Sequence, residues 1–76
     1  MTQPLPAVRP SEVVAALERA GWTVHRQRGS HLSMHKSGRR LLIVPLHSGD
    51  MPKGTLRGLI ADAGLTVDEF VKLLRE

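Results

Sequence analysis

A chain of 76 residues is long enough for one small domain, and because it contains no cysteine it has neither a disulfide framework nor a thiolate metal site. It has no run of roughly 20 apolar residues that could span a membrane and no secretory signal pattern at its start, so we expect a cytoplasmic protein. The formal net charge is +4, and no acidic residue lies between Glu18 and Asp50. The central basic segment, residues 19–40, contains Arg19, Arg26, Arg28, Lys36, Arg39 and Arg40. Such clustering is typical of proteins that bind a phosphate backbone, although net charge can also serve only to keep a small domain dispersed.

The first part of the chain predicts a lead-in followed by a helix. Residues 1–10 contain three prolines and no periodic pattern, which indicates a flexible or extended lead-in. Ser11 offers an N-cap for a first helix, and Gly21 offers its C-terminal stop. The apolar residues between them recur at helical spacing, as Val13, Val14, Ala16, Leu17 and Ala20. We therefore predict an amphipathic helix that ends at Gly21.

The middle of the chain predicts an antiparallel meander of three strands, over residues 22–28, 31–36 and 40–44. The turn formers Gly29-Ser30 and Ser37-Gly38 separate these strands, and such short turns join antiparallel neighbours.

The strand faces can also be predicted. In the second strand, Leu32 and Met34 alternate with polar residues, which period-two geometry places on the opposite face. These polar residues are His31, Ser33 and His35. A straight first strand would place Arg26 and Arg28 on the same face as the apolar Trp22. We therefore expect this strand to twist or to leave the core before Arg26.

The last part of the chain predicts a loop and two helices. Pro45 ends the third strand, and residues 46–54 form a loop rich in turn formers. The second helix is expected to begin around Thr55 and to stop at Gly64, with apolar residues at Leu56, Leu59, Ile60 and Ala63. Thr66 and Glu69 form a capping box for a short last helix.

The order of the predicted elements is α-β-β-β-α with a short extra C-terminal helix. This order predicts an α+β domain whose helices pack on one face of a three-stranded antiparallel sheet. Residues 11–76 form this single domain, after the lead-in at residues 1–10.

Four histidines, His25, His31, His35 and His47, raise the question of a metal site. The Cα atoms of His31 and His35 would be about 13 Å apart on a strand, which is too far for two imidazoles to share one zinc ion. No carboxylate or cysteine completes a familiar ligand set, so we expect no metal and no small-molecule cofactor. Ser30 adjoins His31, but neighbours on an extended chain point to opposite faces, so a serine–histidine relay is not expected.

A single histidine in a basic segment suits proton transfer on RNA. Histidine takes up and releases protons near neutral pH. RNA supplies its own nucleophile, because a base that removes the 2′-hydroxyl proton lets that oxygen attack the adjacent phosphorus, while cations stabilise the phosphoryl oxygens. His31 follows the turn Gly29-Ser30 and is the candidate. From the residues alone, however, an exposed or structural role of His31 is the simpler interpretation.

Several motifs resemble those of HicA-type toxins of bacterial toxin–antitoxin systems, over roughly residues 11–74. The matching segments are Gly21-Trp22, Arg28-Gly29-Ser30-His31, Ile43-Val44-Pro45-Leu46-His47, Pro52-Lys53-Gly54-Thr55-Leu56-Arg57 and Ala63-Gly64-Leu65. The ordered combination of G-S-H, V-P-x-H-x-G and P-K-G-T-L-R is far more specific than any one of these motifs.

The resemblance implies a fold similar to the double-stranded-RNA-binding domain. It also implies the toxin of a type II system, a metal-independent and ribosome-independent endoribonuclease that cleaves single-stranded messenger RNA and is restrained by a HicB-type antitoxin. The catalytic histidine of the family falls on His31, which would act as general acid or base. The candidate RNA-binding residues are Arg26, Arg28, Gly29, Ser30, Lys36 and Lys53.

One departure from the family concerns the residues after His31. Many relatives have a second histidine directly after the first and an aromatic residue two positions later, where this chain has Leu32 and Met34. This departure predicts the loss of a base-stacking ring or a second proton donor at the site.

Two other function classes use the same basic face. One is a non-catalytic RNA-binding module, which would tolerate the loss of His31. It would not stack bases on aromatic rings, because the only aromatic residues apart from histidine, Trp22 and Phe70, both suit the core. The other is a protein-interaction domain that binds an acidic partner or the antitoxin, and it predicts a weak salt dependence of RNA binding.

Overall fold

The computed structural model describes residues 4–76 and shows an α+β fold. The elements in chain order are α1 (Pro10–Arg19), β1 (Thr23–Arg28), β2 (His31–His35), β3 (Leu42–Pro45), α2 (Lys53–Asp62) and α3 (Val67–Leu74). The predicted order is confirmed, including the short C-terminal helix. Among the described residues, no helix is both long enough and apolar enough to cross a membrane.

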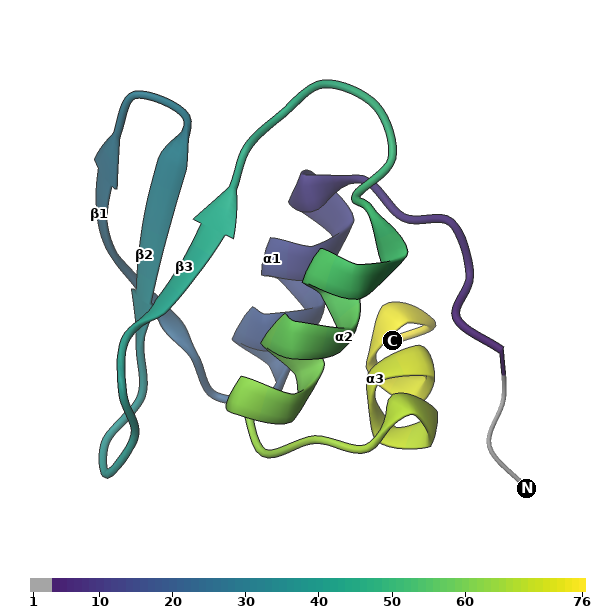
Figure 1. Cartoon of the computed structure of the whole chain (residues 1–76). Coiled ribbons are helices and arrows are strands. Elements are labelled where there is room, and N and C mark those ends of the chain that lie inside the picture. The colour runs from purple at the N-terminus through teal and green to yellow at the C-terminus, as the bar shows by residue number, and fades with distance from the viewer. Residues whose placement is uncertain (1–3) are drawn as a thin grey trace.

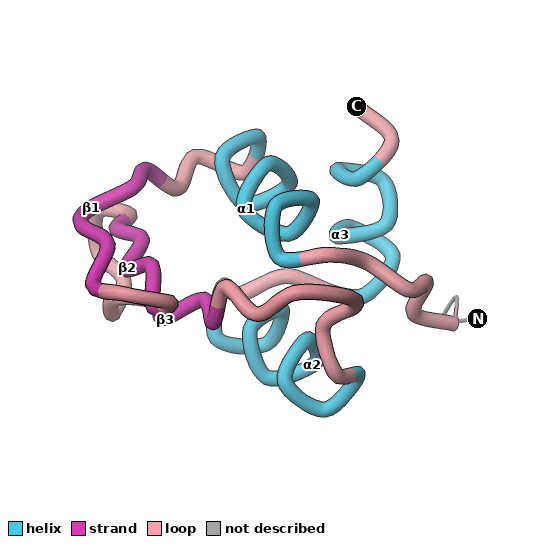
Figure 2. The backbone as a smooth tube through the Cα atoms, turned by 90° about the horizontal axis from the view of Figure 1, so that it is seen from above, coloured by secondary structure: helices cyan, strands magenta, loops and turns pink. Residues whose placement is uncertain are grey.

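All three helices lie on one side of the sheet (Figure 1). Helices α1 and α2 lie next to the strands, and α3 packs against α1 and α2 from the side away from the sheet. Seen from above, the strands form one layer and the helices lie to the right of it (Figure 2). The other side of the sheet, here called the outer face, is covered by none of the helices in residues 4–76.

The three strands form an antiparallel sheet in the order β1-β2-β3. In β2, Leu32 and Met34 are buried, whereas His31 and His35 are exposed and Ser33 is half-buried. The predicted alternation of β2 is therefore confirmed: its apolar side chains face the helices and its polar side chains face outward.

Strand β1 contains a β-bulge between Val24 and Arg26. Val24 pairs with Met34 and Arg26 pairs with Ser33, so His25 is the extra residue. An extra residue reverses the inward and outward alternation of the strand beyond it. The expected change of direction before Arg26 is confirmed, and the bulge is its physical form.

The core lies between the sheet and the helices. Its largest fully buried side chains are Trp22, Phe70, Leu17, Met34, Leu56, Val13 and Val44. Burying a large apolar side chain contributes roughly 1.5–3 kcal/mol, so these residues dominate the stability of a domain this small. The core residues come from all three helices, from β2 and β3, and from the segment before α1.

That segment is packed on the domain. The lead-in expected at residues 1–10 lies partly outside the described residues, and residues 4–9 form neither a helix nor a strand. Leu5 and Val8 are buried, and the Val8 carbonyl accepts a hydrogen bond of 2.7 Å from the Met51 N–H. Two apolar side chains among the prolines thus hold the segment against the core, a role that the absence of periodicity did not predict.

Two of the predicted helix starts are wrong. Helix α1 begins at Pro10 with Arg9 as its N-cap, which lies two residues before the predicted cap at Ser11. Proline suits the first helical position, and the Glu12 carboxylate accepts a hydrogen bond of 2.9 Å from the Arg9 N–H. Helix α2 begins at Lys53, two residues before the expected Thr55.

The remaining helix signals are confirmed. The backbone N–H of Thr66 donates to the Glu69 carboxylate at 2.8 Å, and the N–H of Glu69 donates to the Thr66 hydroxyl at 3.1 Å. Gly21 and Gly64 follow α1 and α2 with φ angles of 96° and 76°. Glycine adopts this left-handed backbone without a steric penalty, so each helix stops where it was expected to stop.

Candidate active site

The β1–β2 turn presents His31 on a rigid backbone. Gly29 and Ser30 form a two-residue turn between the paired residues Arg28 and His31. Gly29 has a φ of 55°, and Ser30 does not have a positive φ. A positive φ at the first turn position alone is the pattern of a type II′ hairpin turn, which strongly favours glycine there.

Two hydrogen bonds hold this turn. The Gln27 side-chain amide donates to the Gly29 carbonyl at 3.1 Å. From the other side, the Leu46 N–H donates to the Ser30 carbonyl at 2.6 Å, just beyond the pairing of His31 with Pro45. The backbone of His31 is therefore fixed from both neighbouring strands, while its side chain is exposed.

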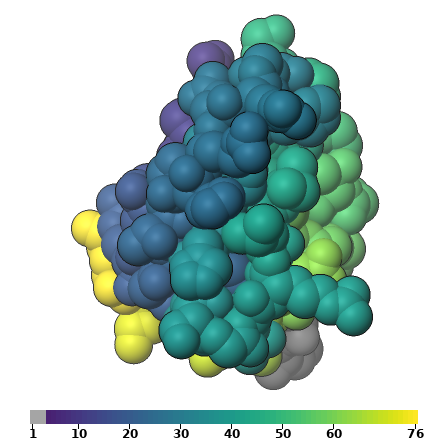
Figure 3. Space-filling model, turned by 90° about the vertical axis from the view of Figure 1, so that its left-hand side faces the viewer, coloured from purple at the N-terminus to yellow at the C-terminus, as the bar shows by residue number. Residues whose placement is uncertain are grey.

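His31 lies in a shallow hollow of about 290 Å³ on the outer face of the sheet. Figure 3 looks onto this face, which consists mainly of the blue and teal residues of the strands and their turns. The outer-face hollow is lined by His25, Arg26, Arg28, His31, Ser33, Leu41 and Ile43. None of these residues is acidic, and two are arginines, so the hollow is suited to an anion.

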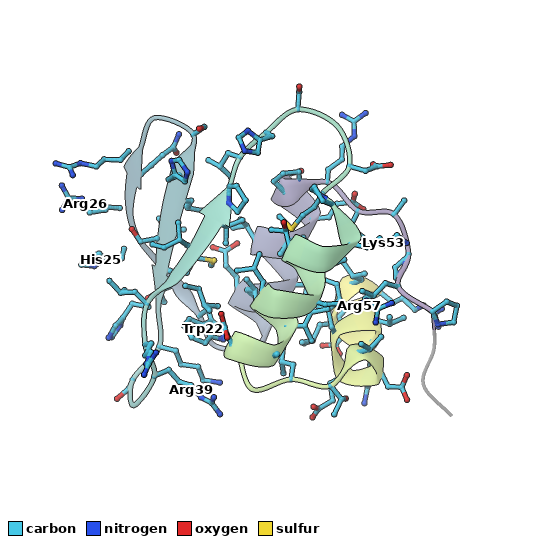
Figure 4. The ribbon with its side chains drawn as sticks, in the orientation of Figure 1. Trp22, His25, Arg26, Arg39, Lys53 and Arg57 are labelled. Atoms are coloured by element: carbon cyan, nitrogen blue, oxygen red, sulfur yellow. The ribbon has the colours of Figure 1, made fainter. Side chains whose placement is uncertain are left out.

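The β-bulge brings the two arginines into the hollow. Because His25 is the extra residue, Arg26 pairs with Ser33 and Arg28 pairs with His31. Residues paired directly across strands share a face, so both arginines lie on the face of the histidine. Figure 4 shows His25 and Arg26 pointing away from the helices, and Trp22 between the sheet and the helices. Without the bulge, Arg26 and Arg28 would point toward the core.

The two predicted lysines lie outside the hollow. The Lys36 ammonium donates to the Ala20 carbonyl at 2.7 Å in a half-buried position. The Lys53 ammonium donates to the Leu5 carbonyl, and Figure 4 shows Lys53 on α2, away from Arg26. Both lysines therefore stabilise the fold, and their contact with RNA stays a prediction.

The other basic residues of the central segment also point elsewhere. The Arg19 guanidinium donates to the Leu73 carbonyl at 2.8 Å. The Arg39 guanidinium lies against Gly64, after the end of α2 (Figure 4). Arg40 lines a different hollow, together with Asp62. The segment that looks like one basic patch in the sequence is thus divided in the structure, and only Arg26 and Arg28 reach His31.

The histidines are dispersed. His25 lines the hollow with His31, whereas His35 ends β2 opposite Thr23 and His47 lines another hollow on the loop after β3. In the described part of the chain, no group of three or more histidine, cysteine, aspartate or glutamate side chains is arranged to hold a metal ion.

The expectation attached to Leu32 and Met34 needs correction. Both side chains face the helices, with 6% and 0% of their surface exposed. A histidine or an aromatic ring at these two positions would enter the core and would not reach the face of His31. The presence of Leu32 and Met34 in place of a histidine and an aromatic residue therefore changes core packing. It removes no stacking ring or proton donor from the hollow.

Four residues of the hollow were not among the predicted site residues: His25, Ser33, Leu41 and Ile43. The alternation in the second strand had placed Ser33 on the face of His31 without giving it a role. The signal for the two aliphatic residues was weak, because the run of residues 41–44 is apolar throughout and does not reveal which side chains face outward. The signal for His25 was that a straight first strand would place Arg26 and Arg28 on the same face as the apolar Trp22. A β-bulge resolves this conflict.

Comparison with known proteins agrees with this architecture. The family model described as HicA toxin of bacterial toxin-antitoxin matches residues 10–65. A chain in a solved structure described as "Toxin-Antitoxin complex from Streptococcus pneumoniae" is 34% identical, with a TM-score of 0.64. That likeness covers 79% of this chain and 100% of the other. None of the curated proteins compared with the chain matches it. Since the family model matches well over half of its residues, this chain belongs to the HicA toxin family of bacterial toxin–antitoxin systems.

Proposed function

We propose that this toxin is a metal-independent endoribonuclease that cleaves messenger RNA, without the ribosome, at the outer-face hollow. The observation that carries the proposal is the position of His31: it is exposed, fixed by a tight turn, and shares a hollow with Arg26 and Arg28. A titratable group beside two exposed arginine side chains is the arrangement that transesterification of RNA needs.

In the proposed reaction, His31 removes the proton of a 2′-hydroxyl as general base. The 2′-oxygen then attacks the adjacent phosphorus, the bond from phosphorus to the 5′-oxygen breaks, and the leaving 5′-oxygen takes up a proton from water. The products are a 2′,3′-cyclic phosphate and a free 5′-hydroxyl. Arg26 and Arg28 stabilise the negative charge that develops on the phosphoryl oxygens. If His31 acts instead as general acid, it supplies the proton to the leaving oxygen, and water accepts the proton of the 2′-hydroxyl.

A HicB-type antitoxin is the proposed partner, acting in the cytoplasm with the toxin. Support comes from the family and from the neighbour solved in a toxin–antitoxin complex. Among the described residues no helix covers the outer face, so an antitoxin that covers the hollow would block His31 and both arginines at once.

The test uses a long single-stranded RNA in the presence of EDTA, with the native protein and two variants. His31→Ala removes the proposed acid or base. His35→Ala is the matched control, because His35 is an exposed histidine of the same strand that does not line the hollow. We expect native protein and His35→Ala to produce cyclic phosphate ends, and His31→Ala to cleave slower by about 10²–10⁴-fold.

The circular dichroism spectrum of His31→Ala should match that of the native protein, since the side chain is exposed. Full cleavage by a folded His31→Ala variant would contradict the role of this histidine. Intact RNA with salt-sensitive binding by all three proteins would instead identify a non-catalytic RNA-binding module.

A further inference from the structure

Two large aliphatic side chains are exposed beside His31. Leu41 and Ile43 have 48% and 49% of their surface exposed, whereas the intervening and following residues, Leu42 and Val44, have 3% and 0%. The alternation follows from strand geometry, because every second side chain of β3 faces the core. The two outward residues both line the outer-face hollow.

This pair differs from an isolated surface residue. A single exposed aliphatic side chain is ordinary, but adjacent ones on one face of a concave surface mark an interaction site. The only other large hydrophobic residue exposed in the described part of the chain is Val24, also at 48%, and it does not line the hollow. Among the described residues, exposed apolar surface of this kind is thus concentrated next to the candidate catalytic histidine.

Backbone pairing arranges the outer face in two rows that cross the sheet. The rows are Arg28, His31 and Pro45, and next to it Arg26, Ser33 and Ile43. Positive charge lies on β1, polar groups lie on β2, and apolar groups lie on β3. Neighbouring strands are about 4.8 Å apart, so the arginines and the aliphatic side chains are separated by about 10 Å across the histidine strand.

We propose that Leu41 and Ile43 form a platform for one unpaired base of the RNA, next to the phosphate that is cleaved. The phosphate faces Arg26 and Arg28, and the base rests its apolar face on the two side chains. The inference rests on the proposed function, because His31 marks the position of the scissile phosphate. The bound base has to be unpaired, since the faces of a paired base are covered by stacking within the duplex.

The charge of the hollow favours RNA as the occupant of this platform. An unpaired nucleotide combines an anionic phosphate with a flat apolar base, which matches arginines on one strand and aliphatic side chains on another. The hollow is lined by two arginines and no acidic residue, so it attracts a polyanion before any apolar contact forms. Because the contact is apolar and makes no base-edge hydrogen bond, it accepts all four bases, with purines favoured by their larger area.

The experiment measures binding of a short 2′-O-methyl RNA, which cannot be cleaved because it lacks a free 2′-hydroxyl. A second oligonucleotide has the same backbone with abasic residues throughout. Fluorescence anisotropy gives the ratio of the two affinities for the native protein, for Leu41→Thr/Ile43→Thr, and for Val24→Thr. Val24→Thr is the matched control, because it changes an equally exposed aliphatic side chain of the same sheet outside the hollow.

We expect the native protein and Val24→Thr to bind the RNA with bases about tenfold more tightly than the abasic one, an effect near the lower end of the range for base stacking on aromatic side chains. Leu41→Thr/Ile43→Thr should bind the two oligonucleotides alike. Its salt dependence should be unchanged, because no phosphate contact has been removed. The single variant Ile43→Thr, which keeps a β-branched side chain on the strand, should show a smaller loss of the same kind.

The proposal is overturned if folded Leu41→Thr/Ile43→Thr shows the same ratio of the two affinities as the native protein. It is also overturned if the native protein binds both oligonucleotides alike. A variant that keeps its RNA ratio but loses affinity for a co-expressed antitoxin would assign the patch to protein docking, which also overturns the proposal. Because the probe is not cleaved, the ratio separates the two hypotheses: an inactive protein with a base-dependent ratio refutes the nuclease and keeps the platform.

Discussion

The two sides of the sheet use their basic side chains in opposite ways. On the helical side, Arg19, Lys36 and Lys53 each donate to a backbone carbonyl of a distant segment. On the outer face, Arg26 and Arg28 line the hollow, and neither donates a side-chain hydrogen bond to another residue in the part of the chain that the structure describes. The same residue types thus serve the fold on one side and are available for a ligand on the other.

The difference shows that net charge alone does not locate a binding surface. A lysine whose ammonium satisfies a carbonyl contributes mainly to stability, because removing it leaves a polar group without its partner. An arginine with free donors on an exposed strand contributes little to stability and can bind phosphate with its planar fork. Substitutions on the two sides should therefore change different measured quantities.

The largest effect on binding is expected from Arg26→Gln/Arg28→Gln. Removing two phosphate contacts should weaken binding of the 2′-O-methyl RNA on the order of tenfold or more at low salt. It should also reduce the slope of log affinity against log salt by about 1.4, or roughly 0.7 for each contact with a single strand. The thermal midpoint should stay close to that of the native protein, since both side chains are exposed.

If the double variant keeps the native slope of log affinity against log salt, Arg26 and Arg28 do not bind the RNA phosphates. The same outcome would move the phosphate contacts to other cations, with Arg40 and Arg57 as the next candidates because both are exposed. A second check is the rate of RNA cleavage, which should fall in Arg26→Gln/Arg28→Gln even at saturating RNA, because the arginines also face the developing charge.

Lys36→Met should lower the stability of the protein and leave its RNA binding unchanged. This change keeps the long apolar stem beside Gly21 but removes the donor to the Ala20 carbonyl. Loss of a charged, half-buried hydrogen bond should lower the free energy of unfolding by about 1.5 kcal/mol, and the melting temperature by about 5–10 °C. Urea denaturation and RNA anisotropy on the same samples separate the two roles. A native melting temperature with a reduced salt slope would show that Lys36 belongs to the RNA-binding surface.

How much of this architecture the sequence predicts depends on the distance between the interacting residues. The Thr66–Glu69 capping box was predicted because its two residues are three positions apart. The roles of Lys36 and Lys53 were not, because their carbonyl partners lie 16 and 48 residues away in the chain. The sequence shows that a residue is basic, but it does not show which group accepts a hydrogen bond from its side chain.

The candidate site was predicted in part for the same reason. His31 follows a local turn signal, and its outward direction follows from the alternation in β2. The arginine conflict in β1 predicted a distortion before Arg26, but only the register shows that the bulge places both arginines beside the histidine. The outward direction of Leu41 and Ile43 depends on which residues of an apolar run pair with β2, and this pairing is a tertiary property.

A smaller effect on RNA cleavage than that of His31→Ala is expected from a glycine substitution, and it tests whether the turn itself serves the site. Gly29 and Gly38 both have positive φ angles, of 55° and 79°, and a Cβ added to either meets no atom within 4 Å. Gly29→Ala and Gly38→Ala should therefore each cost about 1–2 kcal/mol of backbone strain alone. Only Gly29 belongs to the turn that aims His31, so only Gly29→Ala should also slow RNA cleavage, on the order of tenfold through misplacement of the histidine.

We would compare the cleavage rates of the two variants well below their melting temperatures, with each rate corrected for the folded fraction. Equal rates for Gly29→Ala and Gly38→Ala would mean that the turn geometry matters only for stability, and that the pairing of His31 with Arg28 and Pro45 is sufficient to position the imidazole. A slower cleavage rate in Gly29→Ala alone would instead show that cleavage at the outer face depends on the turn geometry as well as on the exposed side chains.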